Sequence, residues 1–276
     1  MNTALKPNED LNRELGGSGV IRTAGRHTID FLIDARGIYL LFIRTLYYVF
    51  CGKRERGAVL RQMYEIGYRS LFFMSLTMAF IGMILVHQAG VQAARIVPDY
   101  NMIGATFCEL LVREIAPSIG ALMLATRVGA GIAAELGSMV VTEQVDAIRM
   151  CAADPIDFLV VPRFLACLVM TPVLVVCAGT IALISGATTA HFAFGVSMHT
   201  FMNANLIHAP VIITCVIKCL AYGTAIPIIS SYCGLSTFGG SEGVGWATTR
   251  AVVNSSLAII VLNFTISVSS FLVFSR

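Results

Sequence analysis

Long apolar stretches alternate with short polar segments along most of this chain. At about 1.5 Å per residue, a helix of about 20 apolar residues covers a hydrocarbon core of about 30 Å. Longer stretches fit by tilting or by breaking. The pattern predicts an all-α integral membrane protein with five transmembrane helices, at about Ser70 to Ala94, Ile103 to Ala134, Val160 to Phe192, Ile207 to Tyr232 and Val252 to Phe274.

The first 50 residues follow a different pattern. Residues 1–26 are polar and lack the apolar core of a signal peptide. Residues 27–50 are apolar and aromatic, but four charged side chains interrupt them, so no uncharged run is long enough to span. We expect a cytoplasmic extension over 1–26, then one membrane domain over 27–276 that opens with an amphipathic interfacial helix at 27–50. The alternative is an ordinary surface helix packed on the bundle.

Composition and charge agree with a membrane location. The chain is 57% hydrophobic and 13% charged, whereas about a quarter of the residues of a soluble domain are charged. Of the 19 Lys and Arg residues, 11 precede residue 70, which predicts a cytoplasmic N-terminus by the positive-inside rule. Five crossings then place the C-terminus outside. The net charge of +3 is too small to argue for nucleic acid.

This orientation assigns each loop to one side of the membrane. The Pro98 to Asn101 turn and the His191 to Asn205 loop are expected outside, and Gly137 to Asp157 and Gly234 to Thr249 are expected in the cytoplasm. The two inner loops do not match in length or charge, and no internal repeat of the kind that marks many secondary transporters is visible. This counts against a secondary carrier.

The second predicted span carries three charged side chains among apolar residues. Glu109 and Arg113 stand four residues apart, in the favourable order for a helical ion pair. Glu114 has no obvious local partner and is the better candidate to face a cavity, while Pro117 permits a kink beside it. The alternative places all three charges near the outer interface, where long side chains reach water.

Lys218 is the last Lys of the chain and lies near the middle of the fourth predicted span. An intramembrane Lys is by default a functional hypothesis, because it needs a partner, a cavity or an anionic ligand. Glu114 and Asn263 are candidate neighbours that the sequence does not place. A purely structural, hydrogen-bonded Lys is the alternative.

Small residues recur every fourth position along the second span. Such a ridge lets another helix approach closely, within the chain or across a dimer. The ridge comprises Ala121, Ala125, Gly129, Ala133 and Gly137.

The segment Val141 to Met150 predicts a short helix parallel to the membrane. Thr142 is its expected cap, and Val145, Ile148 and Met150 form its apolar side. A soluble partner could dock there, and a solvated connecting helix is the alternative. The polar residues of the segment are Glu143, Gln144, Asp146 and Arg149.

Sequence motifs for catalysis are missing. There is no phosphate-binding GxxxxGK[ST] loop, no GxSxG elbow and no Cys/His spacing typical of a metal site. The eight cysteines fall mostly in apolar stretches and are interpreted as small core residues. We expect no catalytic site, no metal and no cofactor, so any ATP is bound by another chain.

Several ordered motifs resemble those of the MlaE/YrbE permeases of MCE-associated ABC transporters. The resemblance covers the chain from about residue 25 onward. The motifs are Leu110-Leu-Val-Arg-Glu-Ile-Ala-Pro117, Arg127-Val-Gly-Ala-Gly131, Ala134-Glu-Leu-Gly-Ser-Met139, Thr142-Glu-Gln144, Ala153-Asp-Pro155, Gly243-Val-Gly, Ala247-Thr-Thr-Arg-Ala-Val-Val253 and Ser255-Ser-Leu-Ala258.

The resemblance implies a permease that pairs with a second copy of itself, each copy bringing an interfacial helix and five spans. It also implies cytoplasmic ABC ATPase subunits, a hexameric MCE-domain protein outside, a small cytoplasmic accessory subunit, and a phospholipid or similar hydrophobic substrate moved between inner and outer membranes. A bacterial inner-membrane location follows.

The same resemblance suggests roles for individual residues. The helix from Glu143 to Met150 becomes a coupling helix for the ATPase, through Glu143, Gln144, Asp146 and Arg149. Glu114 and Lys218 match charged positions in or near the family's lipid cavity, and Arg113 and Asn263 are further candidates to line it. Asn263 departs from relatives that have an acid near this point, so the partner of Lys218 stays open.

Two other classes of function remain as alternatives. A proton-coupled carrier would use Glu114 and Lys218 to exchange protons and would need no ATPase. A membrane-embedded lipid enzyme is the third, and the missing catalytic constellation argues against it.

Overall fold

The computed structural model describes residues 18–51, 56–96, 101–201 and 209–274, and these form helices with no strand among them. Within these described ranges, five helical segments are long and apolar enough to cross a membrane: Gly57–Ala93, Thr106–Val141, Ile156–Phe194, Ala209–Leu235 and Gly240–Val273. The predicted all-α fold with five spans is confirmed. The chain divides into two compact units, residues 1–44 and 45–276.

Most of the described part of the first unit belongs to α2 (Ser18–Cys51), a helix of 34 residues. It begins within the stretch that the sequence predicts as extension, and residues 1–17 lie outside the described part of the chain. The position of this helix in the membrane interface stays a prediction.

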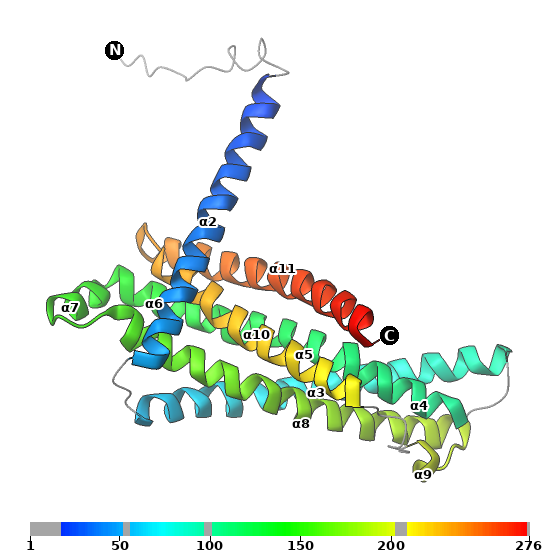
Figure 1. The fold of residues 1–276 in the computed structure, drawn as a ribbon. Helices are drawn as coiled ribbons and strands as arrows, with labels where there is room; N and C mark the ends of the chain where they lie inside the picture. Colours follow the sequence, from blue (N-terminus) through cyan, green and yellow to red (C-terminus); the bar gives the residue numbers. More distant parts are fainter. Residues whose placement is uncertain (1–17, 52–55, 97–100, 202–208, 275–276) are drawn as a thin grey trace, which may run out of the picture. The chain divides into compact units, whose positions relative to one another are not determined.

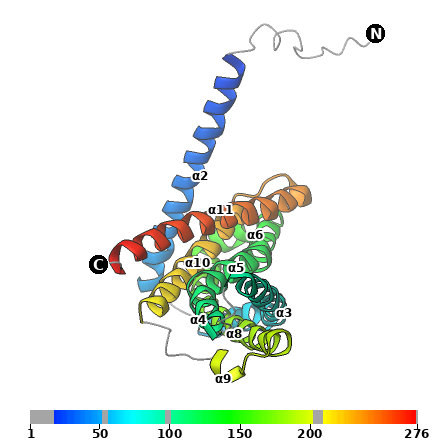
Figure 2. The ribbon, with the colours of Figure 1, turned by 90° about the vertical axis from the view of Figure 1, so that its right-hand side faces the viewer.

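The second unit is a bundle of long antiparallel helices (Figure 1). Its first and third spans, α3 (Arg56–Ile96) and α8 (Val161–Phe194), pack along each other over most of their length. They lie side by side in the end-on view of Figure 2. The fourth and fifth spans are α10 (Ala209–Leu235) and α11 (Gly240–Phe274). The second span is built from α4 (Asn101–Leu110), η1 (Leu111–Ile115), α5 (Ala116–Leu124), η2 (Ala125–Gly129) and α6 (Ala130–Val141).

Shorter elements complete the unit. The link between the second and third spans contains α7 (Gln144–Met150), and the third span begins with a π-helical turn, η3 (Ile156–Val160). Helix α9 (Met198–Phe201) follows α8 within the predicted outer loop at His191 to Asn205. Residues 202–208 of that loop, and residues 98–100 of the predicted outer turn, lie outside the described residues.

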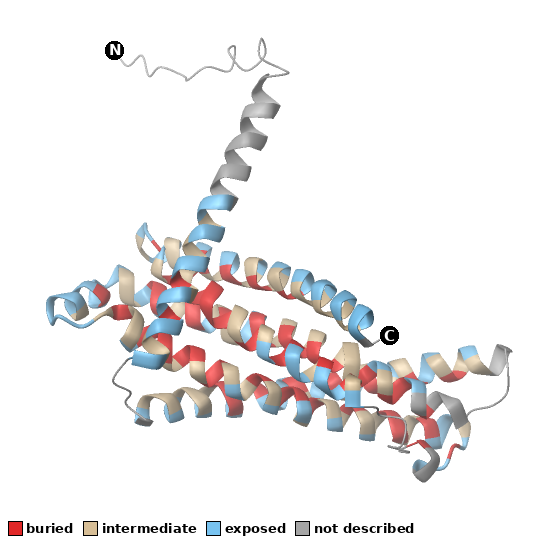
Figure 3. Cartoon of the chain, viewed as in Figure 1, coloured by how far each residue is buried: buried red, intermediate tan, exposed pale blue. Residues whose placement is uncertain are grey.

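Buried residues concentrate where the second span meets its neighbours (Figure 3). Leu111, Leu136 and Tyr222 are fully buried there, and Met74 and Leu174 fill the contact between α3 and α8. Large apolar side chains such as Phe72 and Phe264 are exposed on the outside of the bundle, as expected for helices surrounded by lipid. Four cysteines are buried as predicted, whereas Cys51 and Cys151 are exposed.

Helix ends differ from the predicted span limits. Helix α3 begins 14 residues before Ser70. Arg61 and Glu65 in this part stand four residues apart and pair on one face of the helix. Their charges keep this part out of the hydrocarbon core, but they do not end the helix. The predicted inner loop from Gly234 to Thr249 is also largely helical, since α11 begins at Gly240. The predicted limits follow hydropathy, which indicates where the hydrocarbon core ends. The helices themselves continue beyond it, because backbone hydrogen bonding also stabilises a helix in water.

Candidate functional site

A buried ion pair joins the second and fourth spans. The Lys218 ammonium lies 2.6 Å from Oε2 of Glu114, and the side chain of Lys218 is 0% exposed while that of Glu114 is 30% exposed. Lys218 Nζ also donates a hydrogen bond to the backbone oxygen of Arg113 at 3.1 Å. One of the two neighbours that the sequence offered for Lys218 is therefore its ionic partner.

The local backbone explains why Lys218 meets an acceptor here. Glu114 lies in the π-helical turn η1, and Pro117 follows three residues later. Proline has no N–H, so the oxygen of Arg113 loses the helical donor it would normally receive from residue 117. The Lys218 ammonium donates a hydrogen bond to this oxygen. The π-helical turn followed by proline thus presents both a carboxylate and a backbone oxygen to α10.

Further charges extend this pair toward the surface of the chain. Arg113 lies 3.8 Å from Glu109 and 4.0 Å from Glu114, and all three side chains are partly exposed. The predicted pairing of Glu109 with Arg113 is therefore present. Together with Lys218 the cluster holds two positive and two negative groups, so it is neutral as a whole and polar at one edge.

Polar side chains of α10 and α11 form three hydrogen bonds around the ion pair. Thr214 and Ser270 share a hydrogen bond of 2.6 Å at one side. Ser267 donates to Oε1 of Glu114 at 3.0 Å in the middle. Tyr222 donates to Asn263 at 3.0 Å on the other side. Asn263 therefore accepts a hydrogen bond from Tyr222, which lies one helical turn from Lys218, and takes no part in the ion pair itself.

Four of these residues were missed by the sequence reasoning, although a signal was available. Thr214, Lys218 and Tyr222 recur every fourth residue, and Asn263 is followed four and seven residues later by Ser267 and Ser270. Residues with this spacing share one face of a helix. Two such faces on adjacent spans predict a polar seam between them.

The small-residue ridge of the second span packs within the chain. Ala125, Gly129, Ala133 and Gly137 are buried against α10 and α11. A methyl group added to Gly129 would lie 2.9 Å from Oγ of Ser230, and one added to Gly137 would lie 2.9 Å from Oγ1 of Thr237. The close approach of these helices depends on the absence of larger side chains.

The short helix expected after the second span is α7, and its polar residues all face solvent. Glu143, Gln144, Asp146 and Arg149 are exposed, and Asp146 pairs with Arg149 at 2.9 Å. Val145 is buried and anchors the helix, as expected for its apolar side, whereas Met150 is 90% exposed.

The prediction that Thr142 caps the start of this helix is wrong. The hydroxyl of Thr142 donates to the oxygen of Ser138, so Thr142 closes α6 instead of opening α7. The residue before α7 is Glu143, whose φ of 58° is left-handed. This conformation turns the chain sharply from the second span into α7.

Comparison with known proteins extends this description. The family described as Permease MlaE matches residues 59–269. A probable ABC transporter permease protein of Synechocystis is 38% identical over 221 residues, which cover 78% of this chain and 82% of that protein. A protein with the same description from Rickettsia typhi is 34% identical over 251 residues, covering 90% and 96%.

A plant protein is also similar. Protein TRIGALACTOSYLDIACYLGLYCEROL 1, chloroplastic, of Arabidopsis thaliana is 34% identical over 218 residues, which cover 78% of this chain and 62% of that protein. The family match spans all five membrane helices, and the bacterial relatives cover most of both chains. The chain therefore belongs to the MlaE permease family and is a multi-pass membrane permease.

Proposed function

We propose that this chain is the membrane-spanning subunit of an ABC transporter that moves phospholipid, or a similar hydrophobic molecule, between the inner and outer membranes of a bacterium. The chain has no catalytic role of its own in this proposal. ATP is hydrolysed by a separate cytoplasmic ATPase, and an MCE-domain hexamer outside exchanges lipid with the permease. A small cytoplasmic accessory subunit completes the assembly.

The observation that carries the proposal is the Glu114–Lys218 pair with its partly exposed extension. A lipid needs apolar walls for its acyl chains and a few fixed charges for its head group. Arg113 and Glu109 offer such charges at the edge of the pair, and the hydrogen bond from Ser267 of α11 holds Glu114 in place. A head group can exchange partners with Arg113 while Lys218 and Glu114 keep each other neutral.

The same charges support pairing with a second copy of the chain. Glu109, Arg113 and Arg127 lie in a candidate span and remain partly or largely exposed in a single chain. Exposure of charged groups to hydrocarbon is costly. A second copy facing this surface would enclose the charges in a shared cavity, which is where lipid would enter.

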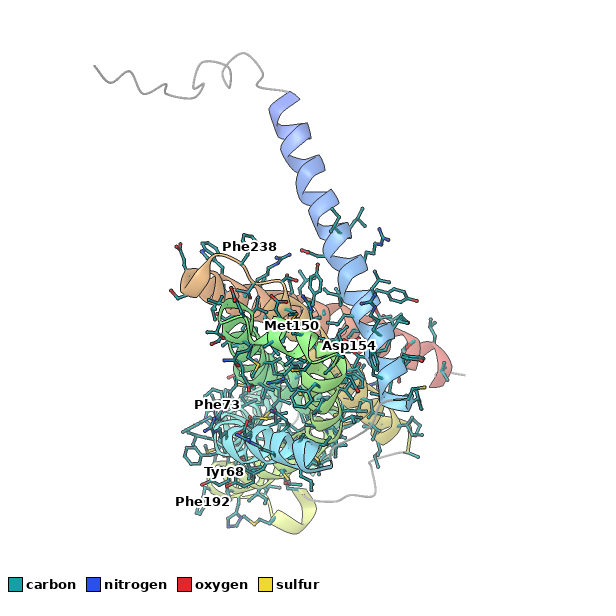
Figure 4. All side chains as sticks on the ribbon, turned by 90° about the vertical axis from the view of Figure 1, so that its left-hand side faces the viewer. Tyr68, Phe73, Met150, Asp154, Phe192 and Phe238 are labelled. Atoms are coloured by element: carbon teal, nitrogen blue, oxygen red, sulfur yellow. The ribbon has the colours of Figure 1, made fainter. Side chains whose placement is uncertain are left out.

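Coupling to the ATPase is assigned to the end of the bundle that carries α7. Figure 4 looks onto this end and shows Met150 and Phe238 at its surface. Both are large apolar side chains and almost fully exposed. With the charged residues of α7 they offer an apolar and polar docking surface for a soluble partner. The N-terminus would then be cytoplasmic and the C-terminus periplasmic.

Photo-crosslinking tests the substrate and the energy source together. A photoreactive residue at Val112, beside the charged cluster, is compared with one at Phe192, which points outward from α8 (Figure 4). Cells are labelled with ³²P-phosphate so that captured phospholipid is counted. We expect capture at Val112 to change when ATP is depleted and capture at Phe192 to stay constant. Equal, ATP-independent capture at both sites would refute the proposal.

Purification of the tagged chain in mild detergent tests the partners. We expect an ATPase and an MCE-domain protein to be recovered together, and recovery of the ATPase to fall when Glu143 and Gln144 are both replaced by Ala. A chain purified alone, with transport that follows a pH gradient, would instead favour the proton-coupled carrier based on Glu114 and Lys218.

A further inference from the structure

The last membrane helix, α11, is held to the bundle in two different ways along its length. In its first half, Ala247, Ala251, Ser255 and Ile259 are buried at intervals of four residues, and this half packs on α6 and η2 of the second span. Residues 260–273, in contrast, include no buried residue (Figure 3). Close packing therefore holds the first half of the helix, while the second half lies on the outside of the bundle.

Hydrogen bonds attach the second half of α11 to its neighbours. The three pairs are Thr214–Ser270, Glu114–Ser267 and Tyr222–Asn263. On α10, Lys218 lies one turn from each of the two hydrogen-bonding residues of that helix. The hydroxyl of Ser267 also lies 3.3 Å from Oε2 of Glu114, the oxygen that Lys218 contacts. The second half of α11 therefore lies against the ion pair and covers it.

These hydrogen bonds decide how firmly this half of α11 stays in place. In a bilayer, an apolar contact between two helices is little better than a contact with lipid tails, and each hydrogen bond between helices contributes modestly. Leu262 is only partly buried against the core, and the large side chains Phe264 and Phe271 are exposed. The contact of this half with the bundle is therefore weak enough to be broken while the packed half stays in place.

We propose that residues 260–273 of α11 form a gate over the Glu114–Lys218 pair. Three hydrogen bonds hold the gate closed, and it opens when this half of α11 swings away from α10 around the packed half. In the closed state the side chain of Lys218 is 0% exposed and that of Glu114 is 30% exposed. In the open state a lipid head group from the membrane reaches both charges. What the gate admits rests on the proposed function, whereas the opening itself does not.

Acetylation of Lys218 measures the opening. The chain has three lysines, Lys6, Lys53 and Lys218, so the modification of Lys218 is resolved by mass spectrometry of its own peptide. Purified full-length protein in detergent is treated with the N-hydroxysuccinimide ester of acetic acid, and the rate of labelling is followed. The reagent needs access to the amine, so the closed gate protects it. We expect slow labelling of Lys218, at a rate that follows the open fraction.

Two substitutions should weaken the gate without touching the ion pair. Asn263→Leu with Ser270→Ala removes two of the three hydrogen bonds and keeps the contact of Ser267 with Glu114. We expect Lys218 to be acetylated about 3-fold to 10-fold faster, because the closed state loses two interhelical hydrogen bonds. An unchanged rate would overturn the proposal.

The matched control is Thr265→Val with Ser269→Ala. These two hydroxyls lie in the same half of α11, but they donate to backbone oxygens of their own helix. The control should label Lys218 at the rate of the parent protein. A rise as large as that in Asn263→Leu with Ser270→Ala would show a general loosening of the helix and would overturn the assignment to the three hydrogen bonds.

A disulfide tests the gate in the opposite direction. The hydroxyl oxygens of Thr214 and Ser270 lie 2.6 Å apart, so Thr214→Cys with Ser270→Cys brings two sulfur atoms within bonding reach. The pair is introduced into a protein whose native cysteines are replaced by Ala. We expect the oxidised protein to label Lys218 several-fold more slowly than the same protein after reduction. Equal rates would show another route to Lys218 and would overturn the gate.

Lipid capture at Val112 shows what the gate admits. The photoreactive residue is combined with the cysteine pair, and membrane vesicles that contain the whole assembly are compared before and after reduction. We expect ATP-dependent capture of phospholipid only after reduction. Equal ATP-dependent capture in both forms would overturn entry of lipid through the gate. The proposed function fails separately, when the parent protein shows no ATP-dependent capture at all.

Discussion

Lys218 lies 2.6 Å from the carboxylate of Glu114, and its ammonium has no exposure to solvent. Replacement of Lys218 by Met should therefore leave the carboxylate without its partner inside the bundle. Loss of one member of a buried pair costs about 3–5 kcal/mol. Because Glu114 is partly exposed, we expect a loss of about 2 kcal/mol or more in the free energy of unfolding, measured by denaturation in detergent.

The double variant Lys218→Met with Glu114→Gln separates stability from function. It removes both charges, so most of the stability should return. If the pair also serves transport, activity should stay low in the double variant. Asp146→Asn breaks an exposed ion pair and is the stability control, with an expected change within about 0.5 kcal/mol. A loss in Asp146→Asn as large as that in Lys218→Met would contradict this account.

Glu143 has a left-handed backbone conformation in the turn before α7, and substitutions there should change the stability of the protein. A residue with a Cβ atom costs about 1–2 kcal/mol in this conformation, and glycine does not. Glu143→Gly should therefore raise the thermal unfolding temperature slightly, and Glu143→Val should lower it.

A functional role for the carboxylate would appear in the same variant. Glu143→Gly keeps the turn but loses the side chain, so reduced recovery of the ATPase from this stable protein would assign the coupling to the carboxylate. If Glu143→Gly and the parent protein recover the ATPase equally, the side chain has no such role.

Gly82 lies in the close contact between α3 and α8, where a larger side chain should destabilise the protein. A methyl group at this position would collide with the backbone oxygen of Ala182 and lie 2.8 Å from Oγ of Ser185. Backbone atoms cannot move aside cheaply, so Gly82→Ala should destabilise the protein by about 1–3 kcal/mol. Gly131→Ala is the control, because a methyl group there meets nothing within 4 Å. Thermal unfolding of both variants in one detergent checks the difference.

A hydrogen bond at Asp154 links it to Tyr48 in the last turns of α2. The Tyr48 hydroxyl donates to Oδ2 of Asp154 at 2.6 Å, while Oδ1 accepts from the N–H of Ile156 at 3.0 Å. Tyr48→Phe should cost about 1 kcal/mol, and Asp154→Ala should cost more because it removes both hydrogen bonds. Tyr47→Phe alters the exposed neighbouring ring and should be neutral. Equal stability of Tyr48→Phe and the parent protein would argue against this link.

The sequence by itself determined the fold class and the number of spans. Each span is about 20 or more apolar residues, and the free energy of placing such a segment in hydrocarbon is a local property of the segment. The spacing of Glu109 and Arg113 likewise predicted their pairing, because residues four apart are neighbours on any helix. The polar face of α7 could be predicted for the same reason.

Only the tertiary structure decided which distant residues meet. The sequence offered Glu114 and Asn263 as neighbours of Lys218, and the choice between them depends on how α10 is rotated and shifted against the second span. The pairing of Glu135 with Arg163 has the same origin. Packing of small residues such as Gly129 and Gly234 sets these positions. Hydropathy reports the transfer of single segments into lipid, but helix contacts are set by side-chain shape across the whole bundle.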